Sequence, residues 1–137
     1  MKKNNFLPLI FSVLILCSSI ANAQDADQNS TIDKIDQNNF SGVAVLQGLN
    51  KVTAKTSDLR IKIGSSMEYG KLIIKVKKCW RSPPDQRPEN KILLSVDEVE
   101  ENGTHKQIFN GWMFSSSPSI SGIEHPVYDL VAIECKN

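Results

Sequence analysis

Residues Leu59 to Cys79, LRIKIGSSMEYGKLIIKVKKC, decide the fold class of this chain. Aliphatic residues occupy every second position on both sides of a glycine-containing turn: Leu59, Ile61, Ile63, Leu72, Ile74 and Val76. Basic residues fill most of the positions between them. Alternation with a period of two is typical of β-strands that have one buried face and one solvent-exposed face. The stretch therefore predicts strands joined by a turn.

The same pattern continues towards the end of the sequence. Lys91 to Glu101 is a further predicted strand, and Asn102-Gly103 predicts a two-residue hairpin turn that returns through His105 to Phe109. A last strand is predicted from Val127 to Cys135. We expect four of its residues to face the core, namely Val127, Val131, Ile133 and Cys135. The predicted fold is all-β, a small sandwich or partly open barrel of about six to eight mostly antiparallel strands.

The beginning of the sequence has the features of a secretory signal peptide. Lys2 and Lys3 precede an apolar run from Phe6 to Cys17, and Ala21-Asn22-Ala23 is a small-x-small cleavage site. The run is shorter than the roughly 20 apolar residues that span a bilayer. We predict export with cleavage after Ala23, over the alternatives of an uncleaved anchor or a lipid attached to Cys17.

Residues 24–137 form the predicted mature protein. Residues 24–39 are rich in Asp, Asn and Gln and predict a disordered polar tether, which leaves residues 40–137 as a single β domain. The signal peptide carries two of the 16 Lys and Arg and none of the 15 Asp and Glu, so the mature net charge is −1. That balance argues against nucleic acid or a lipid surface as partner.

Cysteine usage changes once the signal peptide is removed. Cys17 leaves with it, and only Cys79 and Cys135 remain. In an exported chain, two remaining cysteines predict a disulfide. The alternative is a redox or catalytic thiol, which lacks the support of a C-x-x-C motif or of a His nearby in sequence.

The segment from Cys79 to Asn90, CWRSPPDQRPEN, is the first candidate for function. Its three prolines stiffen the loop, and a stiff loop loses little entropy on binding. Three of its side chains are of kinds that dominate binding hot spots: Trp80, Arg81 and Arg87. The alternative interpretation is a structural crossover whose arginines pair with Asp85 and Glu89.

The segment from Phe109 to Pro126 is the second candidate. An aromatic cluster runs into a serine-rich turn, and Ser117-Pro118 predicts a short helical turn that ends before Pro126. The residues predicted to contact a partner here are Trp112, Ser116 and His125. In the alternative interpretation, Trp112 and Phe114 fill the core while the serines satisfy backbone groups.

A catalytic hypothesis is weaker. A serine between Ser115 and Ser121, with Ser117 as the candidate, His125 and Asp129 could supply nucleophile, base and orienting carboxylate, but there is no G-x-S-x-G motif. His105 and His125 are isolated, so the sequence predicts no metal site, and no cofactor motif is present.

Several motifs together resemble the small exported alphaproteobacterial proteins of the family catalogued as domain of unknown function 2155. The resemblance extends from about Leu46 to Lys136. The motifs that carry it are Asn50-Lys51-Val52-Thr53-Ala54, Lys78-Cys79-Trp80, Ser82-Pro83-Pro84, Arg87-Pro88-Glu89-Asn90, Phe109-Asn110-Gly111-Trp112-Met113-Phe114, Ser116-Ser117-Pro118 and Glu124-His125-Pro126-Val127-Tyr128-Asp129. It implies a periplasmic protein of a Gram-negative envelope, with no established activity or cofactor.

The leading hypothesis is therefore a non-catalytic periplasmic β domain that binds another envelope component, protein or glycan. We expect a monomer or small homo-oligomer without a membrane span after signal cleavage. The alternatives are a periplasmic hydrolase that uses a serine near His125, and an envelope assembly or stability factor without a ligand of its own.

Overall fold

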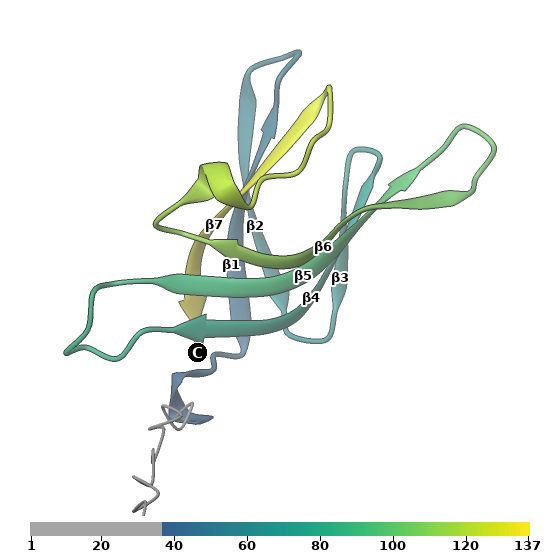
Figure 1. Ribbon diagram of the computed structural model, residues 1–137. Coiled ribbons are helices and arrows are strands. Elements are labelled where there is room, and N and C mark those ends of the chain that lie inside the picture. The colour runs from purple at the N-terminus through teal and green to yellow at the C-terminus, as the bar shows by residue number, and fades with distance from the viewer. Residues whose placement is uncertain (1–36) are drawn as a thin grey trace, which may run out of the picture. The chain divides into compact units, whose positions relative to one another are not determined.

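Seven strands arranged in two antiparallel sheets make up most of the computed structural model, which describes residues 37–137 (Figure 1). The predicted signal peptide, its cleavage site and most of the predicted tether lie outside the described residues. The elements are η1 (Gln37–Asn39), β1 (Val43–Asn50), β2 (Lys55–Lys62), β3 (Ser66–Tyr69), β4 (Leu72–Arg81), β5 (Asn90–Val99), β6 (His105–Phe114), η2 (Pro118–Ile120) and β7 (Tyr128–Lys136), where η marks a 3-10 helix.

One sheet has the strand order β2-β1-β7, and the other has the order β3-β4-β5-β6. Every strand pair is antiparallel. In the four-stranded sheet, neighbours in space are neighbours in sequence, whereas β1 joins the last strand of the fold, β7. The two sheets do not close into a barrel. The predicted all-β class and antiparallel pairing are confirmed.

The core lies between the two sheets and is built by the alternation that the sequence predicts. Its fully buried side chains include Leu46, Ile61, Leu72, Ile74, Val76, Ile92, Leu94, Val96, Met113 and Leu130. All are aliphatic or thioether side chains, and burial of each contributes about 1.5–3 kcal/mol of transfer free energy. The basic residues between them in β4 are exposed, as expected for a strand with one wet face.

The predicted inward face of β7 is partly wrong. The buried residues of this strand are Leu130, Ala132 and Cys135, whereas Ile133 is 41% exposed and Val131 is only half-buried. The physical reason is a β-bulge. The register between β1 and β7 shifts between Val45 and Leu46, and Ile133 has no Cα partner in β1. An extra residue in one strand reverses the alternation beyond it, so Cys135 still faces the core.

The hairpin between β5 and β6 forms where Asn102-Gly103 predicts it, but its loop has three residues. The N–H of Glu100 donates to the carbonyl of Thr104 (2.8 Å), and the N–H of Gly103 donates to the carbonyl of Glu100 (2.9 Å). Within this loop, Gly103 is the residue with a positive φ, 81°. A turn followed by one left-handed glycine is a common three-residue hairpin, so Asn102 does not need positive φ.

The predicted helical turn near Pro118 is present as η2, which ends well before Pro126. The preceding strand β6 is longer than predicted and includes the aromatic cluster up to Phe114. At the other end, η1 occupies the last three residues of the predicted tether. Within residues 37–137, no helix has the length and hydrophobicity that a bilayer crossing requires.

Candidate functional site

The predicted disulfide joins the two sheets at one end of the sandwich. Cys79 in β4 and Cys135 in β7 are bonded, with their Cα atoms 5.6 Å apart, and both are fully buried. Asn90, the first residue of β5, adds a polar link beside them, because its side-chain oxygen accepts a hydrogen bond from the N–H of Cys135 (3.0 Å). We call this region the disulfide end.

A single carboxylate fastens the proline-rich loop to the serine-rich turn at this end. Oε1 of Glu89 accepts hydrogen bonds from the Ser115 hydroxyl (3.0 Å) and the Ser116 N–H (3.1 Å), and Oε2 accepts one from the Ser116 hydroxyl. Ser82 holds the other side of the loop, since its hydroxyl accepts the N–H of Glu89 (2.9 Å). The two candidate segments are therefore joined, as one rigid unit, by what we call the Glu89 clamp.

The clamp also changes the acidity of Glu89. Partial burial acts to raise the pKa of this carboxyl, but hydrogen bonds from the hydroxyl and N–H of Ser116, the hydroxyl of Ser115 and the N–H of Asn90 outweigh it. The pKa is lowered from its ordinary value of 4.5 because these donors favour the ionised form. The suggested pairing of Glu89 with the loop arginines is not observed among the described residues; its carboxylate accepts from Ser115, Ser116 and the N–H of Asn90.

Next to the clamp, the face of the four-stranded sheet that points away from the core carries aromatic side chains. Two rows cross β4, β5 and β6: Trp80, Lys91 and Phe114, then Lys78, Leu93 and Trp112. The residues between these rows, Cys79, Ile92 and Met113, are buried in the core. Trp112 is 37% exposed, so it does not fill the core. We call these six residues the aromatic face.

Lysine side chains lie on or beside this face. The ammonium of Lys91 lies 4.5 Å from the centre of the Trp80 ring, and that of Lys78 lies 5.9 Å from the centre of the Phe40 ring. Lys77 donates a hydrogen bond to the side-chain oxygen of Asn110 in β6 (2.9 Å). These contacts orient three cations along the sheet surface.

The structure brings some of the predicted contact residues together and separates others. Trp80 and Trp112 share the aromatic face, and Arg81 is exposed where β4 ends. Arg87 is exposed in the proline-rich loop, and Ser116 is exposed but held by the Glu89 clamp. These five residues therefore belong to the disulfide end or its neighbouring face.

His125 lies elsewhere and is buried. Its Nε2 lies 3.1 Å from Oε1 of Glu98, and its Nδ1 accepts hydrogen bonds from the N–H groups of Val127 (3.1 Å) and Tyr128 (3.0 Å). Because Nδ1 accepts, Nε2 carries the proton and donates to Glu98. Both ring nitrogens of His125 therefore have partners: Nε2 has the carboxylate of Glu98, and Nδ1 has two backbone N–H groups.

Neither of the other members of the suggested catalytic group, Ser117 and Asp129, is among the hydrogen-bond partners of this imidazole. The Oδ1 atom of Asp129 accepts the N–H of Leu130 (2.9 Å), and the carbonyl of Ser117 accepts the N–H of Ile120 in the η2 turn. A serine nucleophile needs a base within hydrogen-bond reach. The geometry of the described residues supplies no such pair at His125.

At the opposite end of the sandwich, tyrosines replace the disulfide as the contact between sheets. Tyr69 of β3 and Tyr128 of β7 pack edge to face with ring centres 5.4 Å apart, and the His125 ring stacks on Tyr128 at 5.2 Å. Gly70 (φ 61°) lies against this cluster, since a Cβ there would come within 2.2 Å of the Tyr128 hydroxyl. We call this region the tyrosine end.

Sequence analysis missed this cluster. The signal that could have found it is Gly70, a turn glycine beside Tyr69, but nothing in the local sequence indicates that Tyr128 packs there. The contact between the two tyrosines depends on the pairing of β7 with β1, which lies far away along the chain.

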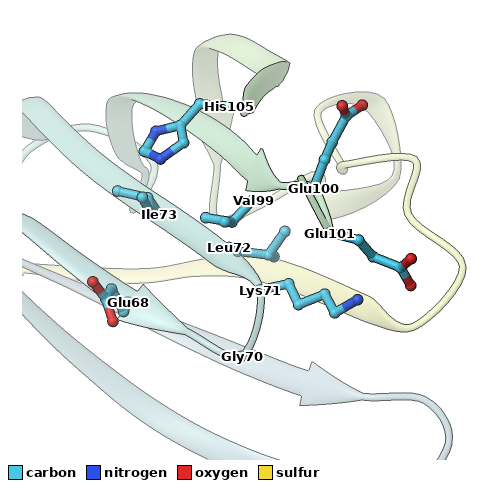
Figure 2. A pocket seen from close by; sticks show the side chains of 9 residues that line it. All are labelled: Glu68, Gly70, Lys71, Leu72, Ile73, Val99, Glu100, Glu101 and His105. Atoms are coloured by element: carbon cyan, nitrogen blue, oxygen red, sulfur yellow. The ribbon is translucent and has the colours of Figure 1, made fainter. Parts of the chain in front are cut away.

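An open pocket of about 470 Å³ lies near the tyrosine end, where β4 begins and the β5–β6 hairpin turns. Figure 2 shows its aliphatic side chains between the strands, while the carboxylates of Glu100 and Glu101 point in different directions at the rim. No group of three or more metal-ligating side chains occurs among the described residues. Although Glu68, Lys71 and His105 also line the pocket, its residues do not form a metal-binding group.

Comparison with known proteins places these features in a family. The model of the family described as "Uncharacterized protein conserved in bacteria (DUF2155)" matches residues 44–135, which include all seven strands except the outermost residues of β1 and β7. The chain belongs to the DUF2155 family. The resemblance inferred from the sequence motifs is thereby confirmed.

A protein of similar sequence is found in Rickettsia. An uncharacterized protein of Rickettsia prowazekii (strain Madrid E) is 30% identical over 109 residues, which cover 80% of this chain and 70% of the Rickettsia protein. No solved structure matches the chain. The range matched by the family model, residues 44–135, contains both cysteines, the Glu89 clamp and the aromatic face. All three therefore lie within the DUF2155 domain.

Proposed function

We propose that this DUF2155 protein is a non-catalytic binding domain of the bacterial cell envelope, exported to the periplasm, and that its aromatic face contacts the partner. The observation that carries the proposal is the exposure of Trp112 on a regular sheet beside Trp80 and Phe114. Tryptophan is enriched among residues that contribute most to binding energy. A strand position holds such a side chain more rigidly than a loop does.

The disulfide end gives this face a rigid support. Cys79 directly precedes Trp80 in β4, so the disulfide is attached to the strand that carries this residue of the aromatic face. The Glu89 clamp joins the two loops that border the face. A surface that is already ordered loses little conformational entropy when a partner binds. The exposed Arg81 and Arg87 extend the proposed contact surface into the proline-rich loop.

Export and periplasmic location rest on the predicted signal peptide. If cleavage follows Ala23, the mature protein begins at Gln24 and contains two cysteines in place of three. Intact-mass measurement of the protein released from the periplasm, before and after reduction and alkylation, tests both points. Retention of residues 1–23, or two alkylatable thiols without reductant, would contradict the proposal.

The binding role is tested by photo-crosslinking in living cells. A photoreactive amino acid is placed at Trp112 and, separately, at Arg81; matched controls carry it at Val52 and Ile133, which are exposed hydrophobic residues outside the aromatic face. We expect one recurrent envelope component at both test positions and not at the controls. Capture equal to that at the control positions would overturn the proposal.

A further inference from the structure

We infer that the partner of the aromatic face is an acidic polysaccharide. This inference rests on the proposed binding function and adds the chemical class of the ligand. It starts from an imbalance of charge on one surface. Three lysines lie in successive rows of β4 and β5 on or beside the aromatic face, namely Lys75, Lys78 and Lys91, and a fourth, Lys77, is the extra residue of a β-bulge in β4.

No carboxylate shares a row with these cations; the nearest acidic residues on this face, Glu68 and Asp97, pair with Ile73 in the next row. The residues that share their rows on the outward side of β5 and β6 are Leu93, Ser95, Asn110, Trp112 and Phe114. The charged pair found within residues 37–137 is Lys136–Glu134, which includes no lysine of this surface. Glu89, in the adjoining clamp, keeps its negative charge, but its oxygens accept hydrogen bonds from Ser115 and Ser116 and not from a lysine. The surface is therefore complementary to anions, although the mature chain has a net charge close to zero.

The contacts of the lysines strengthen this argument. Lys91 lies over the Trp80 ring, and Lys77 is held by Asn110 across the sheet. Both side chains are thereby kept along the surface and not extended into solvent. A cation that is oriented before binding loses less rotamer entropy when it meets an anionic group.

The arrangement of the aromatic residues favours a sugar chain. Trp80 and Trp112 are on β4 and β6, separated by β5 and by one two-residue step along the strands. Strand spacing and rise place their Cα positions about 12 Å apart, a span that covers more than one sugar ring. The C–H faces of pyranose rings pack against aromatic rings, and hydroxyl groups accept hydrogen bonds from ammonium groups.

A protein partner fits this surface less well. The buried centres of protein–protein interfaces are depleted in charged residues, and lysine in particular is rare there. Here lysines alternate with the aromatic residues in the middle of the surface. A polysaccharide with carboxylate or phosphate groups uses both kinds of side chain together.

Titration calorimetry with defined oligosaccharides tests the inference on the full mature protein with its disulfide intact. The probes are a galacturonate oligomer, which carries carboxylates, a phosphomannan oligomer, which carries phosphates, and a neutral galactan oligomer of equal length. We expect at least one acidic probe to bind about tenfold or more tightly than the neutral one, with an affinity that falls as salt is added. The two acidic probes distinguish carboxylate from phosphate recognition.

Two variants assign the binding to this surface. The triple variant K75Q/K77Q/K78Q should weaken binding of the acidic probe about tenfold, whereas K55Q/K62Q/K71Q removes the same charge from exposed positions elsewhere and should leave the affinity unchanged. W112A should weaken binding about tenfold or more, and I133A, on the other sheet, should not. Thermal unfolding of each variant checks that the fold is intact, and W112F serves if W112A does not fold.

The outcomes separate this inference from the function on which it rests. Equal affinity for acidic and neutral probes, or an equal loss in both triple variants, overturns the acidic polysaccharide. Absence of binding to every probe, together with a recurrent protein crosslinked at Trp112, overturns the polysaccharide but leaves a binding domain. Absence of binding, with no adduct above the control positions, overturns both.

Discussion

The two ends of the sandwich hold the same pair of sheets together in different ways. At the disulfide end, a covalent bond between Cys79 and Cys135 does so, with polar links from Asn90 and Glu89 around it. At the tyrosine end, Tyr69 and Tyr128 form the contact by packing. The exposed aromatic residues and the proline-rich loop are found at the first end and not at the second.

The covalent restraint and the proposed binding surface lie at the same end of this small domain. A disulfide and the Glu89 hydrogen bonds restrain the segments that border that surface, whereas the tyrosine contact depends on packing alone. The tyrosine end bears an open pocket, and the disulfide end bears the proposed binding surface. If this assignment is right, damage to the two ends should have different consequences.

The largest effect is expected from removal of the disulfide. The double variant C79A/C135A, or reduction of the native protein, should lower the free energy of unfolding by about 4 kcal/mol, because the unfolded chain is no longer restrained by a cross-link over a sequence separation of 56 residues. Chemical denaturation with and without reductant measures this change. An unchanged denaturation midpoint would show that the disulfide does not contribute to stability at its end of the sandwich.

The next effect concerns the tyrosine end. G70A should lower the free energy of unfolding by about 2–4 kcal/mol, because a Cβ at this position meets the Tyr128 ring and the residue has positive φ. Gly103 provides a matched control, since it also has positive φ but has open space around it. G103A should therefore lower stability by only about 1 kcal/mol. Equal losses would show that the contact with Tyr128 contributes nothing.

A smaller loss is expected from His125. H125A leaves the carboxylate of Glu98 and two backbone N–H groups without their partner, which should lower the free energy of unfolding by about 2 kcal/mol. H105A, at an exposed histidine, should change it by less than about 0.5 kcal/mol. Full stability of H125A combined with loss of a hydrolytic activity would instead support the hydrolase alternative.

The smallest effect depends on pH. The pKa of Glu89 is lower in the folded protein than its ordinary value of 4.5, so ionised Glu89 stabilises the fold above that value. This contribution is lost as the pH falls through the lowered folded-state pKa. It should amount to less than about 1 kcal/mol, because the carboxylate is partly exposed.

Denaturation curves of the native protein and E89Q at neutral and acidic pH measure this contribution. The difference between the two proteins should shrink on acidification, because protonated Glu89 no longer accepts the same hydrogen bonds. E68Q, which changes an exposed carboxylate near the tyrosine end, serves as the control. A pH-independent difference in stability between the native protein and E89Q would show that ionisation of Glu89 does not stabilise the disulfide end.

What could be predicted from the sequence is what local patterns determine. Alternation of aliphatic and basic residues located β4, and the pair of cysteines predicted the disulfide. The bulge at Ile133 could not be predicted, because it arises from the register of β7 against β1 and not from the sequence of β7. The same limit explains why His125 was expected at the binding surface and lies instead beside Glu98.

Only part of the candidate site could be predicted, because its arrangement depends on contacts between residues far apart in the sequence. Residue type and loop stiffness singled out Trp80, Arg81 and Trp112, but not how they are arranged. The partners of Glu89 lie 26 and 27 residues further along the chain, so no spacing rule links them. The lysines that support the further inference were visible only as the polar half of an alternating pattern.

The position of β1 between β2 and β7 has a consequence for the order in which the domain is completed. β1 is the first of the strands in the sequence and β7 the last, and the other five strands lie between them. Until β7 is in place, one edge of β1 is unpaired, and Cys79 lacks Cys135. The three-stranded sheet can therefore be completed only after the end of the chain has arrived, and a chain truncated before Tyr128 keeps an exposed strand edge and a Cys79 thiol without Cys135.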